Sequence, residues 1–257
     1  MTEYIFILAD SELELVPPEI VNERCVLNNA RARGKPPEKI LLDASHHHPA
    51  FGKLPDFERR GRPDIVHFFL MLCLDSDLSA EGKLKAFVHT RNNDVIAVKP
   101  ETRLPPHYPR FVGLIESLYE QRVVPSRENA LLELWNSVPL ELLVDAFKPD
   151  SVVVMNTQGE QAPLEQKFAG IQGGRVVVII GGFSKGEFKS DLSKIKHEVV
   201  SLGPRQQKVW TVTSKVLCAI GNVSKMPAPP QPAAEPEAPV KAPRPSKSRR
   251  APKKKAE

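Results

Sequence analysis

Short apolar runs, most of them rich in β-branched residues, alternate with amphipathic segments through the first 222 residues. Runs of this kind, bounded by glycine, proline or polar clusters, predict strands. The predicted strands cover residues 3–10, 39–45, 83–90, 94–100, 151–156, 175–182 and 197–203. Apolar residues at helical spacing predict helices over residues 18–33, 109–123, 128–147, 162–170 and 207–221.

The order of these elements predicts the fold class. From residue 151 onward, short apolar strands alternate with helices, which is typical of an α/β protein with a mostly parallel sheet and helices on both faces. The strands at 83–90 and 94–100 flank "RNN" and predict a hairpin. The run "IVHFFLMLCL" (65–74) is ambiguous by periodicity, and its length and its position after Pro63 favour a buried strand over a helix.

Three glycine-containing segments follow the last predicted strands: "NTQGE" (156–160), "GGFSKGEF" (181–188) and "LGPRQQ" (202–207). Because ligands of open α/β sheets bind at the carboxyl ends of the strands, we expect a ligand site where these segments meet. The 181–188 segment matches neither the P-loop pattern nor the dinucleotide fingerprint. Each segment alone could be a tight turn, and the convergence of three favours a site.

The last 31 residues differ in composition from the rest. Residues 227–257 contain nine prolines, no aromatic residue, eight Lys/Arg and three Glu. Such a segment buries too little apolar surface to order itself, so we expect a disordered tail after a folded domain at 1–226. Positions 1–226 hold 28 basic and 28 acidic residues, so the net charge of +5 belongs to the tail. A basic arm of this kind attracts nucleic acid, and a solubilising tail is the alternative.

The three cysteines and the amino-terminal segment indicate the compartment. Cys25, Cys73 and Cys218 lie far apart, and the last two stand in apolar runs, which predicts buried, reduced thiols. The amino terminus carries an acid at position 3 and no positive region, unlike a signal peptide. The longest apolar run is too short to span a bilayer. We therefore expect a soluble, cytoplasmic protein.

Two basic stretches are candidates for RNA contacts. In "ERRGRPDIVH" (58–67), Arg62 and Asp64 would share one face of an extended strand and form a two-point ion pair that aims the arginine at a phosphate or base. In "ETRLPPHYPRF" (101–111), arginines surround a tyrosine in a proline-rich loop, which suits an unpaired RNA segment. A structural ion pair and an exposed turn are the respective alternatives.

Other chemical motifs are weak or missing. The histidines of "DASHHHPAF" (43–51) are adjacent and lack Cys, Asp or Glu partners at a suitable spacing, which favours structural histidines over a metal site. The sequence contains no Gly-x-Ser-x-Gly elbow and no His-Glu-x-x-His motif. If the protein is an enzyme, a cofactor is expected to carry the reactive chemistry.

Taken together, these stretches resemble a known family. Residues 61–118, beginning "GRPDIVHFFLMLCL" and ending "PRFVGLIESL", and the segment "IIGGFSKGEF" (179–188) resemble the ribosomal RNA small-subunit pseudouridine N1-methyltransferases of the trefoil-knot (SPOUT) class. The likeness runs over residues 1–222. It implies an α/β fold with a C-terminal trefoil knot, a homodimer, S-adenosyl-L-methionine as cofactor, and methylation at N1 of a flipped-out pseudouridine in small-subunit rRNA.

The resemblance also assigns roles to residues. It implies that the three glycine-containing segments bind the cofactor through Asn156, Thr157, Gly181, Gly186, Leu202, Gly203, Pro204, Arg205, Gln206 and Gln207. It implies that Arg62, Arg103 and Arg110 contact the RNA and that Asp64 orients an arginine. No residue is an obvious general base, and no metal is implied.

The chain departs from the family pattern in two places. Pro106 stands where the family often has a second arginine, so one RNA contact is absent or passes to His107. The segment "GPRQQK" (203–208) lacks a small apolar motif before the last helix. Two other hypotheses compete with the enzyme: an rRNA-binding ribosome-assembly factor whose methylation is weak or dispensable, and a doubly wound nucleotide-binding protein. The missing phosphate-binding patterns disfavour the latter.

Overall fold

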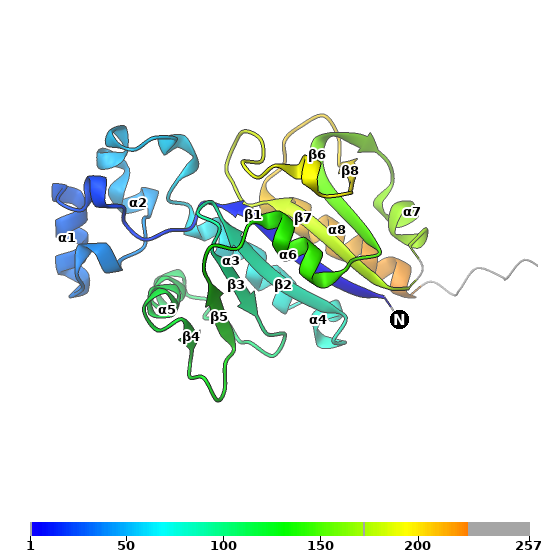
Figure 1. The fold of residues 1–257 in the computed structure, drawn as a ribbon, viewed down its shortest axis with the longest axis horizontal. Coiled ribbons are helices and arrows are strands. Elements are labelled where there is room, and N and C mark those ends of the chain that lie inside the picture. Colours follow the sequence, from blue (N-terminus) through cyan, green and yellow to red (C-terminus); the bar gives the residue numbers. More distant parts are fainter. Residues whose placement is uncertain (1, 172, 226–257) are drawn as a thin grey trace, which may run out of the picture. The chain divides into compact units, whose positions relative to one another are not determined.

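One eight-stranded sheet organises the chain (Figure 1). The computed structural model describes residues 2–171 and 173–225, so the tail expected at 227–257 lies outside the described residues. The strand order is β4-β5-β3-β2-β1-β7-β6-β8. The strands are β1 (Glu3–Ser11), β2 (Leu84–Thr90), β3 (Val95–Val98), β4 (Val123–Val124), β5 (Leu132–Trp135), β6 (Ser151–Gln161), β7 (Arg175–Gly181) and β8 (Glu198–Ser201).

Five neighbouring strands are parallel, and the other three are antiparallel. β1 pairs in parallel with both β2 and β7, and β6 pairs in parallel with both β7 and β8. β2 and β3 form the predicted hairpin, and β5 and β4 extend it in antiparallel fashion. The mostly parallel sheet expected from the sequence is therefore confirmed.

Helices cover both faces of this sheet. The helices of the described residues are α1 (Arg24–Arg33), α2 (Ala44–His47), α3 (Pro63–Leu74), α4 (Asp77–Ala80), α5 (Tyr108–Gln121), α6 (Leu140–Phe147), α7 (Leu164–Ala169) and α8 (Val209–Lys225). Of these, α1 and α2 lie in an insertion and do not cover the sheet. Alternate residues of β1 point to opposite faces: Phe6 packs into the core that contains α3, α5, α7 and α8, while Ile7 packs into the core that contains α6. In Figure 1, α6 lies in front of the sheet and α8 behind it.

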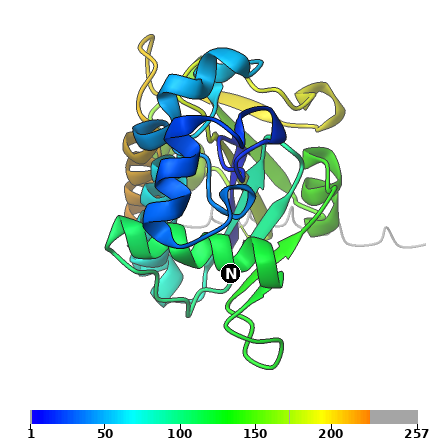
Figure 2. The same ribbon diagram turned by 90° about the vertical axis from the view of Figure 1, so that its left-hand side faces the viewer.

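Residues 16–54 form an insertion with a small core of its own. Short turns of 3₁₀ helix and the helices α1 and α2 bury Val26, Ile40 and Phe51. Figure 2 views this insertion from its own side, with α1 in front. Glu116 of α5 fastens it to the main domain, because its buried carboxylate accepts hydrogen bonds from Arg33 and Lys35 at 2.5–2.7 Å.

Three predicted elements are wrong. Residues 65–74 are the helix α3, with Pro63 at its start, because a helix buried on most sides is apolar all round and shows no helical period. Residues 39–45 form no strand: Leu41 makes one isolated bridge to Leu15, and Asp43 then caps α2. The first half of the predicted helix 128–147 contains β5, whose pairing with β3 and β4 overrides its helical propensity.

Further expectations from the sequence can be compared with the structure. All three cysteines are free; Cys73 is buried as predicted, whereas Cys218 lies exposed on the outer side of α8, so its predicted burial is wrong. Within residues 2–171 and 173–225, no helix is long and apolar enough to cross a membrane. The helices and strands predicted from residue 151 onward are all present.

Candidate functional site

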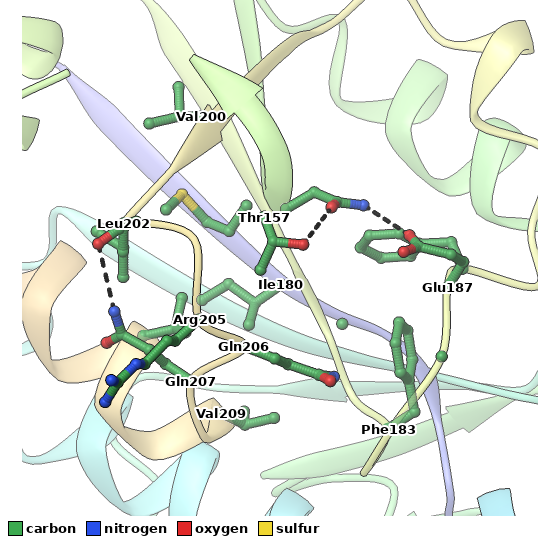
Figure 3. A pocket seen from close by; sticks show the side chains of 17 residues that line it. Thr157, Ile180, Phe183, Glu187, Val200, Leu202, Arg205, Gln206, Gln207 and Val209 are labelled. Atoms are coloured by element: carbon green, nitrogen blue, oxygen red, sulfur yellow. Dashed lines mark hydrogen bonds between the residues drawn. The ribbon is translucent and has the colours of Figure 1, made fainter. Parts of the chain in front are cut away.

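A pocket opens where β6, β7 and β8 end (Figure 3). Because the three strands are parallel neighbours in the order β7-β6-β8, their carboxyl ends lie at one edge of the sheet. The strand register brings Met155 beside both Ile180 and Val200. One wall of the pocket is apolar and is made by Met155, Ile180, Val200, Leu202, Val209 and Val212.

The rim of the pocket is polar. Asn156, Thr157, Glu187, Arg205, Gln206 and Gln207 supply amide, hydroxyl and charged groups. In Figure 3 the labelled side chains of this rim come from β6, from the segment after β7 and from the segment before α8. An apolar wall combined with a limited set of polar groups at the rim is the usual composition of a small-molecule site.

The segment at 156–160 differs from its sequence prediction, because it belongs to β6 rather than to a loop. The pairing of β6 with β8 is interrupted between Met155 and Glu160, and this irregularity turns Asn156 and Thr157 toward the pocket. A Cβ on Gly159 would meet the backbone of Val199 at 2.6 Å, so only glycine permits β8 to approach so closely here.

The segment after β7 is held in place by residues from other parts of the chain. Glu12, at the end of β1, accepts hydrogen bonds through Oε1 from the backbone N–H of Ser184 at 2.8 Å and from its hydroxyl at 3.0 Å. The guanidinium of Arg59 lies 4.4 Å from the ring centre of Phe183. Gly186 has φ +82°, in the left-handed region that favours glycine. The segment therefore has a defined shape before any ligand binds.

Burial perturbs Glu12. Its side chain is buried, its second oxygen Oε2 has no hydrogen-bond partner among the described residues, and burial raises the pKa of its carboxyl. The bonds from Ser184 and the positive charges of Arg62 and Arg59 act in the opposite direction. No local pattern in the sequence indicates the position of Glu12, because its partner Ser184 lies far away in the chain.

A second, smaller pocket adjoins the first. Phe183, Gln206, Gln207 and Val209 line both pockets, so these four residues form the boundary between them. The second pocket adds Arg62, Ile65, Ser184, Lys208 and Trp210. It thus brings the amino-terminal end of α3 against the beginning of α8, a juxtaposition that sequence alone does not reveal.

Arg62 is oriented by Asp64. Nε and Nη2 of Arg62 donate to the two carboxylate oxygens of Asp64, each at 2.8 Å. The expected two-point pair is therefore present, but it spans the start of α3 and not an extended strand. The hydrogen bonds and the charge of Asp64 raise the pKa of Arg62 above its ordinary value, so the guanidinium stays charged beside the second pocket.

Comparison with known proteins identifies the family. Residues 6–221 match the family model "EMG1/NEP1 methyltransferase". The chain belongs to the EMG1/NEP1 methyltransferase family. A protein of Thermococcus onnurineus named "Ribosomal RNA small subunit methyltransferase Nep1" is 45% identical over 82% of this chain and 94% of its own length, and its counterpart in Methanothrix thermoacetophila is 44% identical over 84% and 94%.

A solved structure agrees with the family assignment. Archaeoglobus fulgidus Nep1, crystallised with S-adenosylhomocysteine, superposes with a TM-score of 0.76 at 38% identity and covers 87% of this chain and 98% of its own. The resemblance expected from the sequence is thus confirmed, and so is the fold class at the level of the parallel sheet and its helices. The trefoil knot itself stays a prediction.

The structure places most of the cofactor residues expected in this EMG1/NEP1 family member around the first pocket. Nine of the ten line it; Pro204 does not and is exposed. The sequence missed the apolar wall except for Leu202, and it missed the aromatic residues Phe183 and Phe188 and the carboxylate of Glu187. The spacing of "SKGEF" offered a signal for Glu187, since it lies one residue after a glycine already assigned to the site.

The remaining RNA residues expected for the family lie outside both pockets. Arg103, His107 and Arg110 are exposed, in the segment before α5 and in its first turn. Two hydrogen bonds fix this segment: His67 of α3 donates to the carbonyl of Pro105 at 2.9 Å, and the hydroxyl of Tyr108 donates to Asp43 at 2.6 Å. The three exposed side chains therefore stand on a supported surface that reaches back to α3.

Among the described residues, no group of three or more His, Cys, Asp or Glu side chains is arranged to hold a metal ion. The histidines of 46–48 differ from one another. His47 is fully buried and accepts a hydrogen bond from the backbone N–H of Asp43, while His46 and His48 are exposed. A structural role for His47 agrees with the hypothesis drawn from the sequence.

Proposed function

We propose that this chain is an S-adenosyl-L-methionine-dependent methyltransferase that modifies N1 of a pseudouridine in the RNA of the small ribosomal subunit. The observation that carries the proposal is that nine of the ten residues expected to bind the cofactor line one pocket at the ends of β6, β7 and β8. The match of residues 6–221 to a methyltransferase family supports it. The relatives named as small-subunit rRNA methyltransferases and the relative crystallised with S-adenosylhomocysteine support it. We also propose that the chain acts in the cytoplasm, because the named relatives come from archaea, in which ribosomes are made there.

The residues of the first pocket fit the cofactor. Its apolar wall suits the adenine ring, and the amides of Asn156, Gln206 and Gln207 with the hydroxyl of Thr157 suit the ribose and the amino-acid group. No aspartate or glutamate other than Glu187 and no cation other than Arg205 is among the described lining residues. When bound, the cofactor supplies an electrophilic methyl group on a positively charged sulfur.

The second pocket suits the target base. Trp210 and Phe183 provide aromatic surface, Arg62 provides a fixed guanidinium for the RNA, and Ser184 offers a hydroxyl. Since the two pockets share four residues, a base held in the second would stand next to the cofactor in the first. Holding the base and the cofactor in adjacent pockets makes the reaction effectively unimolecular, which accelerates it.

The proton on N1 has no obvious acceptor in the pocket wall. None of the described residues that line the second pocket is Asp, Glu or His. Positioning by Arg62 and Ser184, with release of the weakly acidic N1 proton to water, is therefore the mechanism that these residues support. The RNA backbone would lie against the exposed side chains of Arg103, His107 and Arg110.

We also propose a homodimer and a C-terminal knot, as the family resemblance implies. An aromatic pair supports the dimer: Phe68 of α3 is 49% exposed and lies 5.1 Å, centre to centre, from Trp210 of α8. A second copy packed on α3 and α8 would cover this pair and stand beside the second pocket. The order of the strands supports the knot, because β7 lies between β1 and β6 although it follows both in the sequence. The strand order alone does not define a knot.

Mass spectrometry of a modified hairpin tests the proposal. A small-subunit rRNA hairpin that carries pseudouridine is incubated with the purified protein and S-adenosyl-L-methionine, and the same hairpin with uridine is the control. One added methyl group on the pseudouridine hairpin alone is the expected result. Tight binding of the hairpin without methylation would instead favour an assembly factor, the second candidate from the sequence.

A further inference from the structure

Glu187 introduces into the first pocket a negative charge that no described cation pairs with. It is the one carboxylate among the described lining residues. Figure 3 shows its side chain at the polar rim, with a hydrogen bond drawn to it. Nδ2 of Asn156 donates to Oε2 of Glu187 at 2.9 Å, and Nε2 of Gln158 lies 3.4 Å from Oε1. Two neutral amides from β6 therefore orient the carboxylate without cancelling its charge.

The cations nearest in the sequence point elsewhere. The ammonium group of Lys185 pairs with Glu58 at 2.7 Å, and that of Lys189 donates to the backbone carbonyl of Arg91 at 3.3 Å. Within the described part of the chain, no Lys, Arg or His forms an ion pair with Glu187. Arg205 also lines the pocket, but Figure 3 shows it on the opposite side from Glu187, and the two form no ion pair. The carboxylate is therefore free to attract a positively charged ligand.

The cofactor and its product differ by one charge. In methyl transfer, the bond between sulfur and the methyl carbon breaks, a bond between N1 and that carbon forms, and the electron pair left on sulfur makes it a neutral thioether, while the N1 proton leaves to water. A fixed negative charge attracts the positively charged form before transfer and loses that attraction afterwards.

We propose that Glu187 makes the pocket bind the positively charged methyl donor more tightly than the neutral product. The product would then dissociate more readily, because its sulfur no longer carries a positive charge. The inference rests on the function proposed above and goes beyond it, because it concerns discrimination between two forms of one ligand. Glu187 is exposed, so water and salt screen the attraction. An effect of roughly fivefold in affinity is expected for a charge pair several ångströms apart near the surface.

Binding measurements on single variants test this proposal without relying on catalysis. The dissociation constants of S-adenosylmethionine, of S-adenosylhomocysteine and of sinefungin, whose amine is positively charged, are measured by calorimetry at low salt. Glu187→Gln keeps the shape and the hydrogen-bonding ability of the side chain and removes its charge. It is expected to weaken both positively charged ligands about fivefold and to leave S-adenosylhomocysteine within about twofold.

A matched control and a salt series sharpen the result. Glu160→Gln makes the same chemical change at an exposed carboxylate of β6 that does not line the pocket, and it should leave all three affinities unchanged. In the unaltered protein, the preference for the positively charged ligands should shrink as salt increases, and in Glu187→Gln it should not depend on salt.

The remaining outcomes separate the two proposals. Equal weakening of all three ligands by Glu187→Gln, or no weakening at all, would overturn the role of charge and leave the proposed function intact. Failure of the unaltered protein to bind any of the three would overturn the cofactor assignment and this inference with it. Because S-adenosylhomocysteine serves as an internal reference, a variant that still binds it normally is known to be folded.

Discussion

The guanidinium of Arg62 meets both carboxylate oxygens of Asp64, each at 2.8 Å, across the start of α3. Both side chains are about one-third exposed, so the pair adds little to stability. Its effect is on direction: the planar guanidinium is held in one orientation at the edge of the second pocket.

Asp64→Asn is therefore expected to weaken RNA binding about tenfold, because a neutral amide cannot hold both N–H groups of Arg62, and to leave cofactor affinity unchanged. Fluorescence anisotropy with a labelled rRNA hairpin measures the first effect, and calorimetry the second. Arg62→Lys is the companion variant, since it keeps the charge and removes the two-point geometry. If it bound RNA as tightly as the unaltered protein, orientation would not matter here.

The last three strands of the chain were predictable because their signal is local. β7, β8 and the first part of β6 are β-branched runs bounded by turn residues, a local pattern that is typical of strands. α3 was not predictable in this way. It packs against the sheet, α5 and α8, so apolar residues occupy nearly all of its faces and its period disappears.

The same distinction applies to the site. Segments after parallel strands must meet at one edge, which is why nine of the ten residues expected around the cofactor line the first pocket; their binding role stays a prediction. The contacts of Ser184 with Glu12, and of Arg62 with the pocket that contains Trp210, join distant parts of the chain. They depend on packing rather than on any local pattern, so the sequence alone could not reveal them.

Glu116 is a second place where a single change should have a large effect. Its side chain is 1% exposed and accepts hydrogen bonds from Arg33, Lys35 and the backbone N–H of Leu41. Glu116→Gln removes the charge between two cations and is expected to lower the free energy of unfolding by about 3 kcal/mol. Urea denaturation measures this loss, and faster amide exchange in residues 24–42 would localise it to the insertion.

The control for this change lies one turn further along α5. Glu120 pairs with Lys39 at 2.7 Å, but both side chains are more than half exposed. Glu120→Gln should therefore leave the unfolding curve almost unchanged, since surface pairs contribute little. Similar losses for the two variants would contradict the view that the buried carboxylate fastens the insertion.

The basic tail should contribute to RNA affinity through charge alone. Deleting residues 227–257 removes eight Lys/Arg and three Glu, and it is expected to weaken RNA binding and to flatten its dependence on salt. Cofactor affinity should not change. A full-length variant with those eight basic residues replaced by Gln separates charge from length, and it should behave like the deletion. An unaltered salt slope in both would show that the tail does not bind RNA.

His47 should make stability depend on pH. It is fully buried in the insertion, and its Nδ1 accepts a hydrogen bond from the backbone N–H of Asp43 at 3.1 Å, which requires that nitrogen to be unprotonated. Burial lowers the pKa of His47 from 6.5 to about 4, although the nearby carboxylate of Asp43 acts in the opposite direction. The folded protein therefore resists protonation of this ring.

Because the pKa is lower in the folded than in the unfolded state, the contribution of His47 is complete above about pH 6.5 and is lost progressively as the pH falls toward 4. Between pH 7 and pH 5, the free energy of unfolding should fall by about 2 kcal/mol on this account. Urea denaturation at several pH values measures the fall. His47→Gln should remove this part of the slope, whereas substitution of the exposed His46 by Gln should retain it. Equal slopes for the unaltered protein and His47→Gln would mean that the ring is protonated in the folded state or that another group dominates.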